Sequence, residues 1–205
     1  MVNNYNYHDG ANLWIYSART YTKESIAGIE HIYGCLSKES SPLPVTDCHP
    51  ELDTSPLLGL DDHRKLQMSL SILQWLVTTS CPDLCNLVFS LNRFGACPRD
   101  SHLNLAVCAF GYLKQVPDPK IGIDPRPMKF DRSSPKFEKL RPKFLEDYPD
   151  AKEEIDPSFP SSFGPVMETN IMVDSDHAHD QKTRHSLTGL LAFVSSTRVI
   201  WLSKR

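Results

Sequence analysis

The chain has 205 residues and a mass of 23.2 kDa, with 40% hydrophobic and 23% charged side chains, which fits one globular domain or two small ones. Its 22 basic and 25 acidic side chains give a formal net charge of −3, which excludes a polycation built to coat nucleic acid. No apolar run approaches the roughly 20 residues that cross a bilayer, and the first ten residues are polar, so neither a membrane span nor a secretory leader is expected.

The six cysteines show no C-x-x-C pair and no spacing typical of a zinc site or a small disulfide scaffold. Reduced thiols in a cytoplasmic or nuclear protein are therefore expected.

The first predicted elements are a strand and a helix. Residues 13–17 are aromatic and β-branched and follow a turn dipeptide, so they predict one strand of a hairpin, whose partner we expect upstream of Met1. Helical spacing of apolar residues then predicts a helix that Thr20 or Thr22 caps and Gly34 ends. Residues 40–62 contain prolines that prevent regular structure, and they predict an extended strap.

Three further helices are predicted in the middle of the chain. They begin at Asp61, whose carboxylate suits a helix N-terminus, at Pro82, which the first turn of a helix tolerates, and at about Asp100. The short connection over residues 95–98 predicts that the last two pack as antiparallel neighbours. Facing apolar stripes on these helices predict a small core.

The second half of the chain predicts a β-meander. After a strand-like Ile121–Ile123 run, residues 125–168 are rich in proline and in charges of both signs, as in a linker. Residues 170–174, 190–194 and 199–202 then read as three strands. Such a sheet would have two open edges and little to pack against. The predicted class is α+β, with a small helical subdomain, a linker and an incomplete meander.

The densest group of candidate ligands runs from Asp174 to Asp180. Asp174 and Asp176 share a face if the strand continues through them, because strand side chains alternate, and both could then bind one Mg²⁺. His177 and His179 would point together by the same rule and could hold zinc. A solvated turn after the strand is the competing interpretation.

Other candidates are weaker. Cys81 and Cys85 lie one helical turn apart without a histidine nearby in sequence, which favours buried thiols over a nucleophile. The basic stretches 132–143 and 182–185 could touch phosphates, although a solvated loop is the favoured interpretation and acidic residues interrupt the first stretch.

The order of several segments resembles a known family. The segments are His63–Leu70, Leu73–Thr79, Pro82–Leu84, Ser90–Phe94, Pro98–Leu103, Phe110–Lys114, Thr183–Leu190 and Trp201–Lys204. In this order they resemble the Pol polyprotein of copia-type LTR retrotransposons, in the region just after the polymerase palm. The resemblance runs from about Tyr16 to Arg205.

This resemblance implies a division of the chain into three parts. Residues 1–124 would be the thumb and connection region of a reverse transcriptase, 125–168 a linker, and 169–205 the first three strands of an RNase H domain. The intact family synthesises DNA on an RNA template and cleaves RNA in RNA–DNA hybrids with Mg²⁺. Its partners would be such a hybrid or a DNA duplex, together with the remainder of the Pol polyprotein.

The same resemblance assigns a role to Asp174, which maps onto the first RNase H carboxylate. The polymerase carboxylates would lie upstream, and the other RNase H carboxylates beyond Arg205, so the isolated chain is not expected to be active. The chain departs from the family at Cys81, where arginine is usual, and at Asp176–His177, where an aspartate followed by tryptophan is common.

Two alternatives from other classes stay open. One is a non-catalytic interaction module derived from a retrotransposon, which pairs its open apolar sheet with another chain by edge addition. The other is a metal-binding protein centred on His177 and His179.

Overall fold

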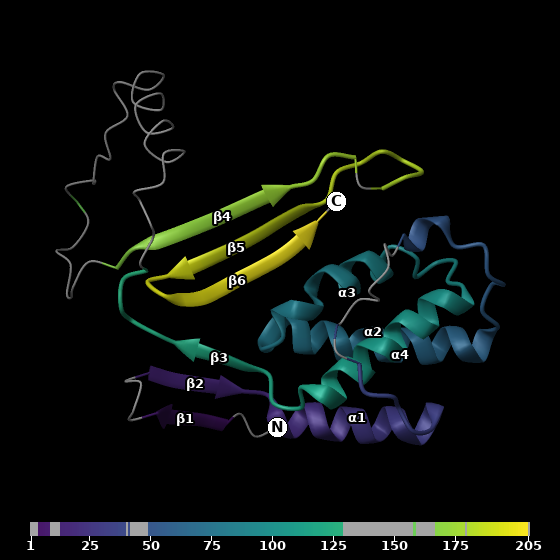
Figure 1. The fold of residues 1–205 in the computed structure, drawn as a ribbon, viewed down its shortest axis with the longest axis horizontal. Helices are drawn as coiled ribbons and strands as arrows, with labels where there is room; N and C mark the ends of the chain where they lie inside the picture. The colour runs from purple at the N-terminus through teal and green to yellow at the C-terminus, as the bar shows by residue number, and fades with distance from the viewer. Residues whose placement is uncertain are drawn as a thin grey trace.

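The structure is a computed structural model, and it describes residues 4–8, 13–39, 41, 49–128, 158, 167–178 and 180–204. Helices and sheets both contribute, so the predicted α+β class is confirmed. Figure 1 shows the helices gathered together at the right, with both sheets at the left, one above the other. The elements are β1 (Asn4–His8), β2 (Leu13–Ser17), α1 (Arg19–Tyr33), the 3₁₀ turn η1 (Pro50–Leu52), α2 (Leu60–Thr79), η2 (Pro82–Leu84), α3 (Cys85–Asn92), α4 (Asp100–Gln115), β3 (Lys120–Ile123), β4 (Thr169–Ser175), β5 (Thr188–Val194) and β6 (Thr197–Lys204).

Both sheets are antiparallel, in the orders β1-β2-β3 and β4-β5-β6. The expectation that β2 pairs with a strand upstream of Met1 is wrong, because β1 lies within the chain and pairs with β2 from Asn4↔Ser17 to His8↔Leu13. The meander predicted for the last part of the chain is confirmed as β4, β5 and β6. Each strand is longer than its apolar run, because polar residues at the strand ends also join the ladder.

The core lies among the helices, as the apolar stripes predicted. Leu66, Leu73 and Leu76 of α2 are fully buried, and they meet buried side chains from α1, α3 and α4. The helix predicted at Pro82 begins as the 3₁₀ turn η2 and continues as α3. At roughly 1.5–3 kcal/mol for each fully buried leucine, this core supplies most of the stabilisation.

The ends of α1 differ from the prediction in one respect. The helix begins at Arg19, after Ala18, so Thr20 and Thr22 lie inside its first turn instead of capping it. The Thr22 hydroxyl donates to the Ala18 carbonyl at 3.0 Å. Gly34 ends the helix with a φ of 84°, a left-handed conformation that favours glycine, as expected.

The strap over residues 49–58 is fixed to the start of α4 by a polar network. Asp53 accepts hydrogen bonds from the Ser55 amide at 2.8 Å and from the Ser101 hydroxyl. His102 is 2% exposed, and its Nδ1 accepts the Arg99 amide hydrogen while its Nε2 lies 3.1 Å from the Pro50 carbonyl oxygen. The Nε2 atom therefore carries the proton, and the ring joins the strap to the helix.

The expectation that the second sheet has little to pack against is wrong. Trp201 of β6 packs against the helical core, and its indole Nε1 donates to the Val77 carbonyl oxygen at 2.5 Å. That carbonyl belongs to the last turn of α2, where helix carbonyls lack intrahelical partners. The predicted linker, residues 125–168, lies outside the described residues except for 125–128, 158 and 167–168.

We expect Trp201→Phe to destabilise the protein by about 1–3 kcal/mol, because the change leaves the Val77 carbonyl without its donor. Urea unfolding followed by far-UV circular dichroism measures the effect. Trp14→Phe is the matched control, since Trp14 is 51% exposed and we expect a change below about 0.5 kcal/mol. Equal stability of the two variants would contradict a docking role for Trp201.

Candidate functional site

A cleft of about 420 Å³ lies between the β4–β6 sheet and the start of α3. Its walls combine apolar side chains with the carboxylates of Asp83, Asp174 and Asp176, and we call it the acidic cleft. This size and mixture are typical of a small-molecule site. The lining residues are Pro82, Asp83, Cys85, Asn86, Met172, Val173, Asp174, Asp176, Leu187, Gly189, Leu190, Leu191, Trp201, Leu202 and Ser203.

Asp174 and Asp176 both line the acidic cleft, but the first lies within strand β4 and the second follows it. Asp174 lies near the end of β4 and pairs in register with Gly189. The strand ends at Ser175, so Asp176 follows it, and its Oδ1 accepts the Leu187 amide hydrogen at 2.6 Å. That bond closes the hairpin loop between β4 and β5. The carboxylate of Asp176 therefore has a local structural role.

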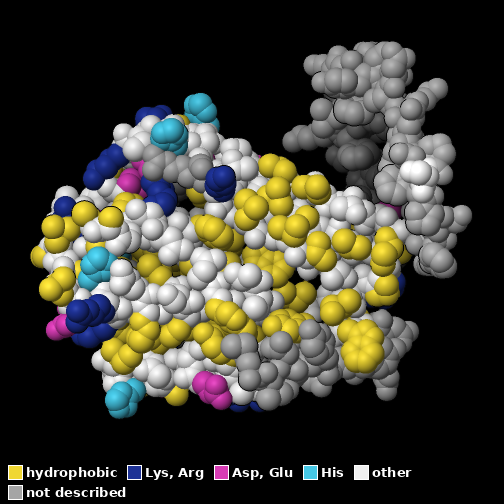
Figure 2. Space-filling view, turned by 180° about the vertical axis from the view of Figure 1, so that it is seen from behind, with side chains coloured by type: hydrophobic (Ala, Val, Ile, Leu, Met, Phe, Trp, Pro, Cys, Tyr) yellow, Lys and Arg dark blue, Asp and Glu magenta, His cyan; other side chains and the backbone are white. Residues whose placement is uncertain are grey.

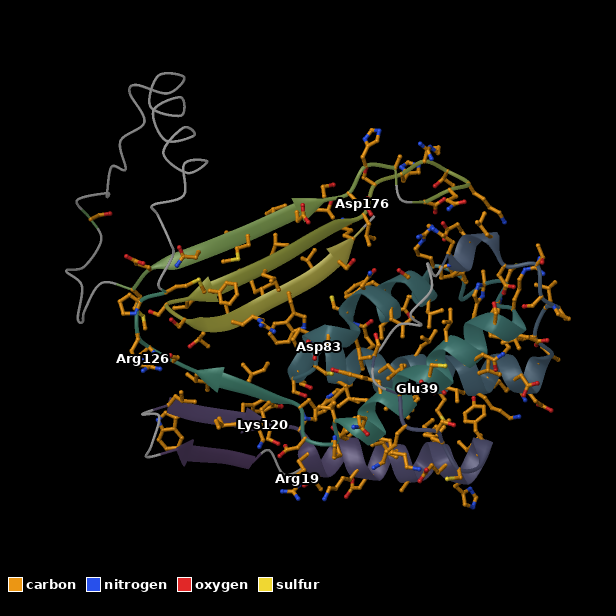
Figure 3. All side chains as sticks on the ribbon, viewed as in Figure 1. Arg19, Glu39, Asp83, Lys120, Arg126 and Asp176 are labelled. Carbon is orange, nitrogen blue, oxygen red and sulfur yellow. The ribbon has the colours of Figure 1, made fainter. Side chains whose placement is uncertain are left out.

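Asp83 is the acidic residue that the sequence did not assign to this site. It lies in η2, and its Oδ2 accepts a hydrogen bond from the Tyr112 hydroxyl at 2.9 Å. Burial and the nearby Asp83 carboxylate raise the pKa of Tyr112 to about 12, so the phenol stays protonated and donates. Figure 3 shows Asp83 beside the helices and Asp176 beyond the end of β4, so the two labelled carboxylates come from separate walls.

The remaining carboxylate of the predicted ligand group points elsewhere. Asp180 is 3% exposed and pairs with the Arg93 guanidinium, which reaches it from the end of α3. Its other oxygen, Oδ1, accepts the amide hydrogens of Lys182 and Thr183 at 3.0 and 2.8 Å. Asp180 therefore holds the loop between β4 and β5 against the helices.

Glu51 of the strap contacts the same loop between β4 and β5. Its Oε1 accepts the Gln181 amide hydrogen at 3.1 Å and lies 3.0 Å from His49 Nδ1. Burial raises the pKa of Glu51, but hydrogen bonds from Gln181 and His49 outweigh that effect and hold the pKa below its ordinary value. The glutamate is therefore ionised at neutral pH.

The described residues do not gather three histidine, cysteine or carboxylate ligands at one point. His177 is exposed in the loop after β4, and His179 lies outside the described residues, so the zinc hypothesis stays a prediction. A Zn²⁺ titration that shows no stoichiometric binding would remove it. The Mg²⁺ hypothesis for Asp174 and Asp176 also stays a prediction.

The thiols near the cleft are not activated. Burial raises the pKa of Cys81 to about 12, and it also raises the pKa of Cys85. Because the thiolate is the nucleophile, neither residue has the character of a catalytic cysteine, in agreement with the sequence interpretation. What the cleft offers chemically is three carboxylates together with apolar side chains.

Comparisons with known proteins give no relative for this chain: no family model, no curated protein and no solved structure matches it. Within the described residues, none of the helices combines the length and the apolar character that a membrane span requires.

We expect Arg93→Met to destabilise the protein by about 3–5 kcal/mol, because it leaves the buried Asp180 carboxylate without its cation. Denaturant unfolding measures the loss. Arg64→Met is the control, since Arg64 and its partner Asp61 are 77% and 88% exposed and such pairs contribute little. If the double variant Arg93→Met with Asp180→Asn is no more stable than Arg93→Met alone, the pair does not anchor the loop.

Proposed function

We propose that this chain is a piece of a copia-type retrotransposon Pol protein. It comprises a thumb and connection-like helical part and the first strands of an RNase H-like sheet. The observation that supports the proposal is the order of its parts: a helical core precedes an antiparallel meander whose first strand carries Asp174 near its end. The resemblance of the sequence motifs suggests the same order.

The proposal assigns Asp174 the role of the first RNase H carboxylate. In an intact relative it would bind Mg²⁺ together with carboxylates from other segments, and the metal would activate water against the RNA strand of a hybrid. The face of β4 that carries Asp174 borders the acidic cleft, so its carboxylate has open space before it. Of the RNase H-type carboxylates, the resemblance assigns only Asp174 to this chain, and one such carboxylate does not assemble a two-metal site.

In this proposal the chain would contact a nucleic acid through its phosphate groups. Several described cations pair with carboxylates, among them Lys65 with Asp62 at 2.6 Å and Lys120 with Asp118 at 3.0 Å. The basic stretch 182–185 lies in the loop beside the cleft, whereas 132–143 lies outside the described residues. Contacts of this kind position a duplex without reading its sequence.

A second candidate function is a non-catalytic interaction module. A specific observation favours it: Ile171 and Val173 of β4 and Ile200 of β6 are 63%, 61% and 52% exposed. Figure 2 shows hydrophobic side chains gathered in the region of this sheet. Exposed apolar strands at a sheet edge are suited to edge addition by another chain.

We expect the purified 205-residue chain to show no Mg²⁺-dependent cleavage of an RNA–DNA hybrid, because the resemblance assigns only Asp174 of the RNase H-type carboxylates to it. A fluorescent hybrid with 10-fold excess protein, with and without Mg²⁺, provides the measurement. Cleavage that disappears in Asp174→Asn, but persists in Asp61→Asn as the exposed control, would contradict this expectation.

The origin of the chain is tested by the nucleotide sequence around its reading frame. We expect codons for a Tyr-x-Asp-Asp hairpin upstream and for the remaining RNase H carboxylates downstream, with or without stop codons between them. Flanking sequence that encodes neither motif in any reading frame would overturn the proposed origin.

A further inference from the structure

Within the described residues, the outer edge of β4 lacks the usual protection of a strand edge. Among the described strands, β4 pairs with β5 alone, and Figure 1 shows it at the margin of the sheet. Its sequence, Thr169–Ser175, contains no proline, lysine or arginine, the residues that commonly guard an edge. Two of its apolar side chains, Ile171 and Val173, are more than 60% exposed.

The hydrogen bonds around β4 show which backbone groups face this edge. The Glu168 carbonyl accepts from Ser195, and the Asp176 amide donates to Leu187, so both residues bond toward β5. Residues that bond toward the same neighbour alternate along an antiparallel strand. The odd-numbered residues from 169 to 175 therefore direct their N–H and C=O groups to the open edge.

We propose that two copies of this chain pair through their β4 edges, antiparallel about a two-fold axis at Met172, to form a continuous six-stranded sheet. The inference builds on the second candidate function, edge addition, and names its partner as a second copy. All four outward-facing residues of each strand find partners in this arrangement, which gives about eight backbone hydrogen bonds.

Side-chain complementarity selects this register. With the axis at Met172, Ile171 lies opposite Val173 of the second copy on the outer face. On the other face, Asn170 lies opposite Asp174 of the second copy, so that one polar residue faces another. Cross-strand pairs of these kinds stabilise a sheet.

The neighbouring registers are less favourable. An axis at Ile171 places Glu168 opposite Asp174, and like charges directly opposite one another destabilise a sheet. An axis at Val173 places Ile171 opposite Ser175 and Met172 opposite Asp174, so apolar side chains face polar ones. Registers with the two-fold axis between two residues would place the outer face of one copy beside the inner face of the other, because strand side chains alternate.

The other edge of the sheet is partly covered, which favours a closed dimer over an open polymer. At the start of β6, the Asp124 amide donates to the Thr197 hydroxyl at 2.7 Å, and the Ser196 amide donates to the Asp124 carbonyl at 3.2 Å. Pairing β4 with β4 uses the same surface on both copies, so the interface closes on itself.

Sedimentation equilibrium tests the assembly. We expect the wild-type chain to have twice the monomer mass of 23.2 kDa at micromolar concentration. Ile171→Lys should raise the dimer dissociation constant at least tenfold, because it places a lysine at the edge of both copies. Ile200→Lys is the matched control, because Ile200 is similarly exposed on the same face but lies in β6, and it should leave the dimer intact.

Disulfide trapping tests the register in a background with Cys35, Cys48 and Cys97 changed to serine. Met172→Cys should form a cross-linked dimer, because the Cα atoms of a non-hydrogen-bonded antiparallel pair lie about 4.5 Å apart. Ile171→Cys alone should not, since the two copies of residue 171 would be diagonal neighbours about 7–8 Å apart. A mixture of Ile171→Cys and Val173→Cys proteins should cross-link.

A folded wild-type monomer at every concentration tested, or polydisperse aggregates, would overturn the inference. A dimer that persists in Ile171→Lys and fails to trap through Met172→Cys would overturn it as well. Near-UV circular dichroism confirms that each variant is folded. Neither experiment involves nucleic acid, so their failure is distinguishable from failure of the proposed retrotransposon origin, which the flanking sequence decides.

Discussion

The position of the β4–β5–β6 sheet on the helices depends chiefly on one contact, the docking of Trp201 against the end of α2. The indole buries its rings beside the helical core and donates to a carbonyl that the helix itself leaves unpaired. A three-stranded sheet with one apolar face has little stability of its own. Because this contact holds β6 against the helices, it decides which face of the sheet is covered.

The two faces of the sheet consequently differ. The face that carries Met172, Asp174 and Trp201 looks toward the helices and borders the acidic cleft. The opposite face carries Ile171, Val173 and Ile200, which remain largely exposed. The sheet therefore has the cleft on one face and an exposed apolar surface on the other. Such a sheet can complete its packing with further protein, from a longer chain or from a second copy.

Much of the fold was predictable because its signals are local. Apolar spacing located α2 and α4, Gly34 ended α1, and short apolar runs located β4 to β6. The contacts between distant segments could not be predicted from the sequence. Gly111 lies inside α4, where its Cα approaches the backbone of the segment that follows α1: an added Cβ would lie 2.6 Å from the Ser37 carbonyl oxygen. Nothing in the neighbouring sequence indicates such a crossing.

The candidate site illustrates why dense acidic sequence is weak grounds for a metal centre. The carboxylates from 174 to 180 are adjacent in the chain, but the strand ends at Ser175 and the loop turns each one differently. Asp180 is neutralised by Arg93, and Asp176 accepts an amide hydrogen, so both are engaged in holding the loop. Asp83, which is distant in sequence, nevertheless lines the same cleft as Asp174 and Asp176. Carboxylates converge on a ligand when tertiary packing brings separate segments together, and sequence density alone does not achieve this.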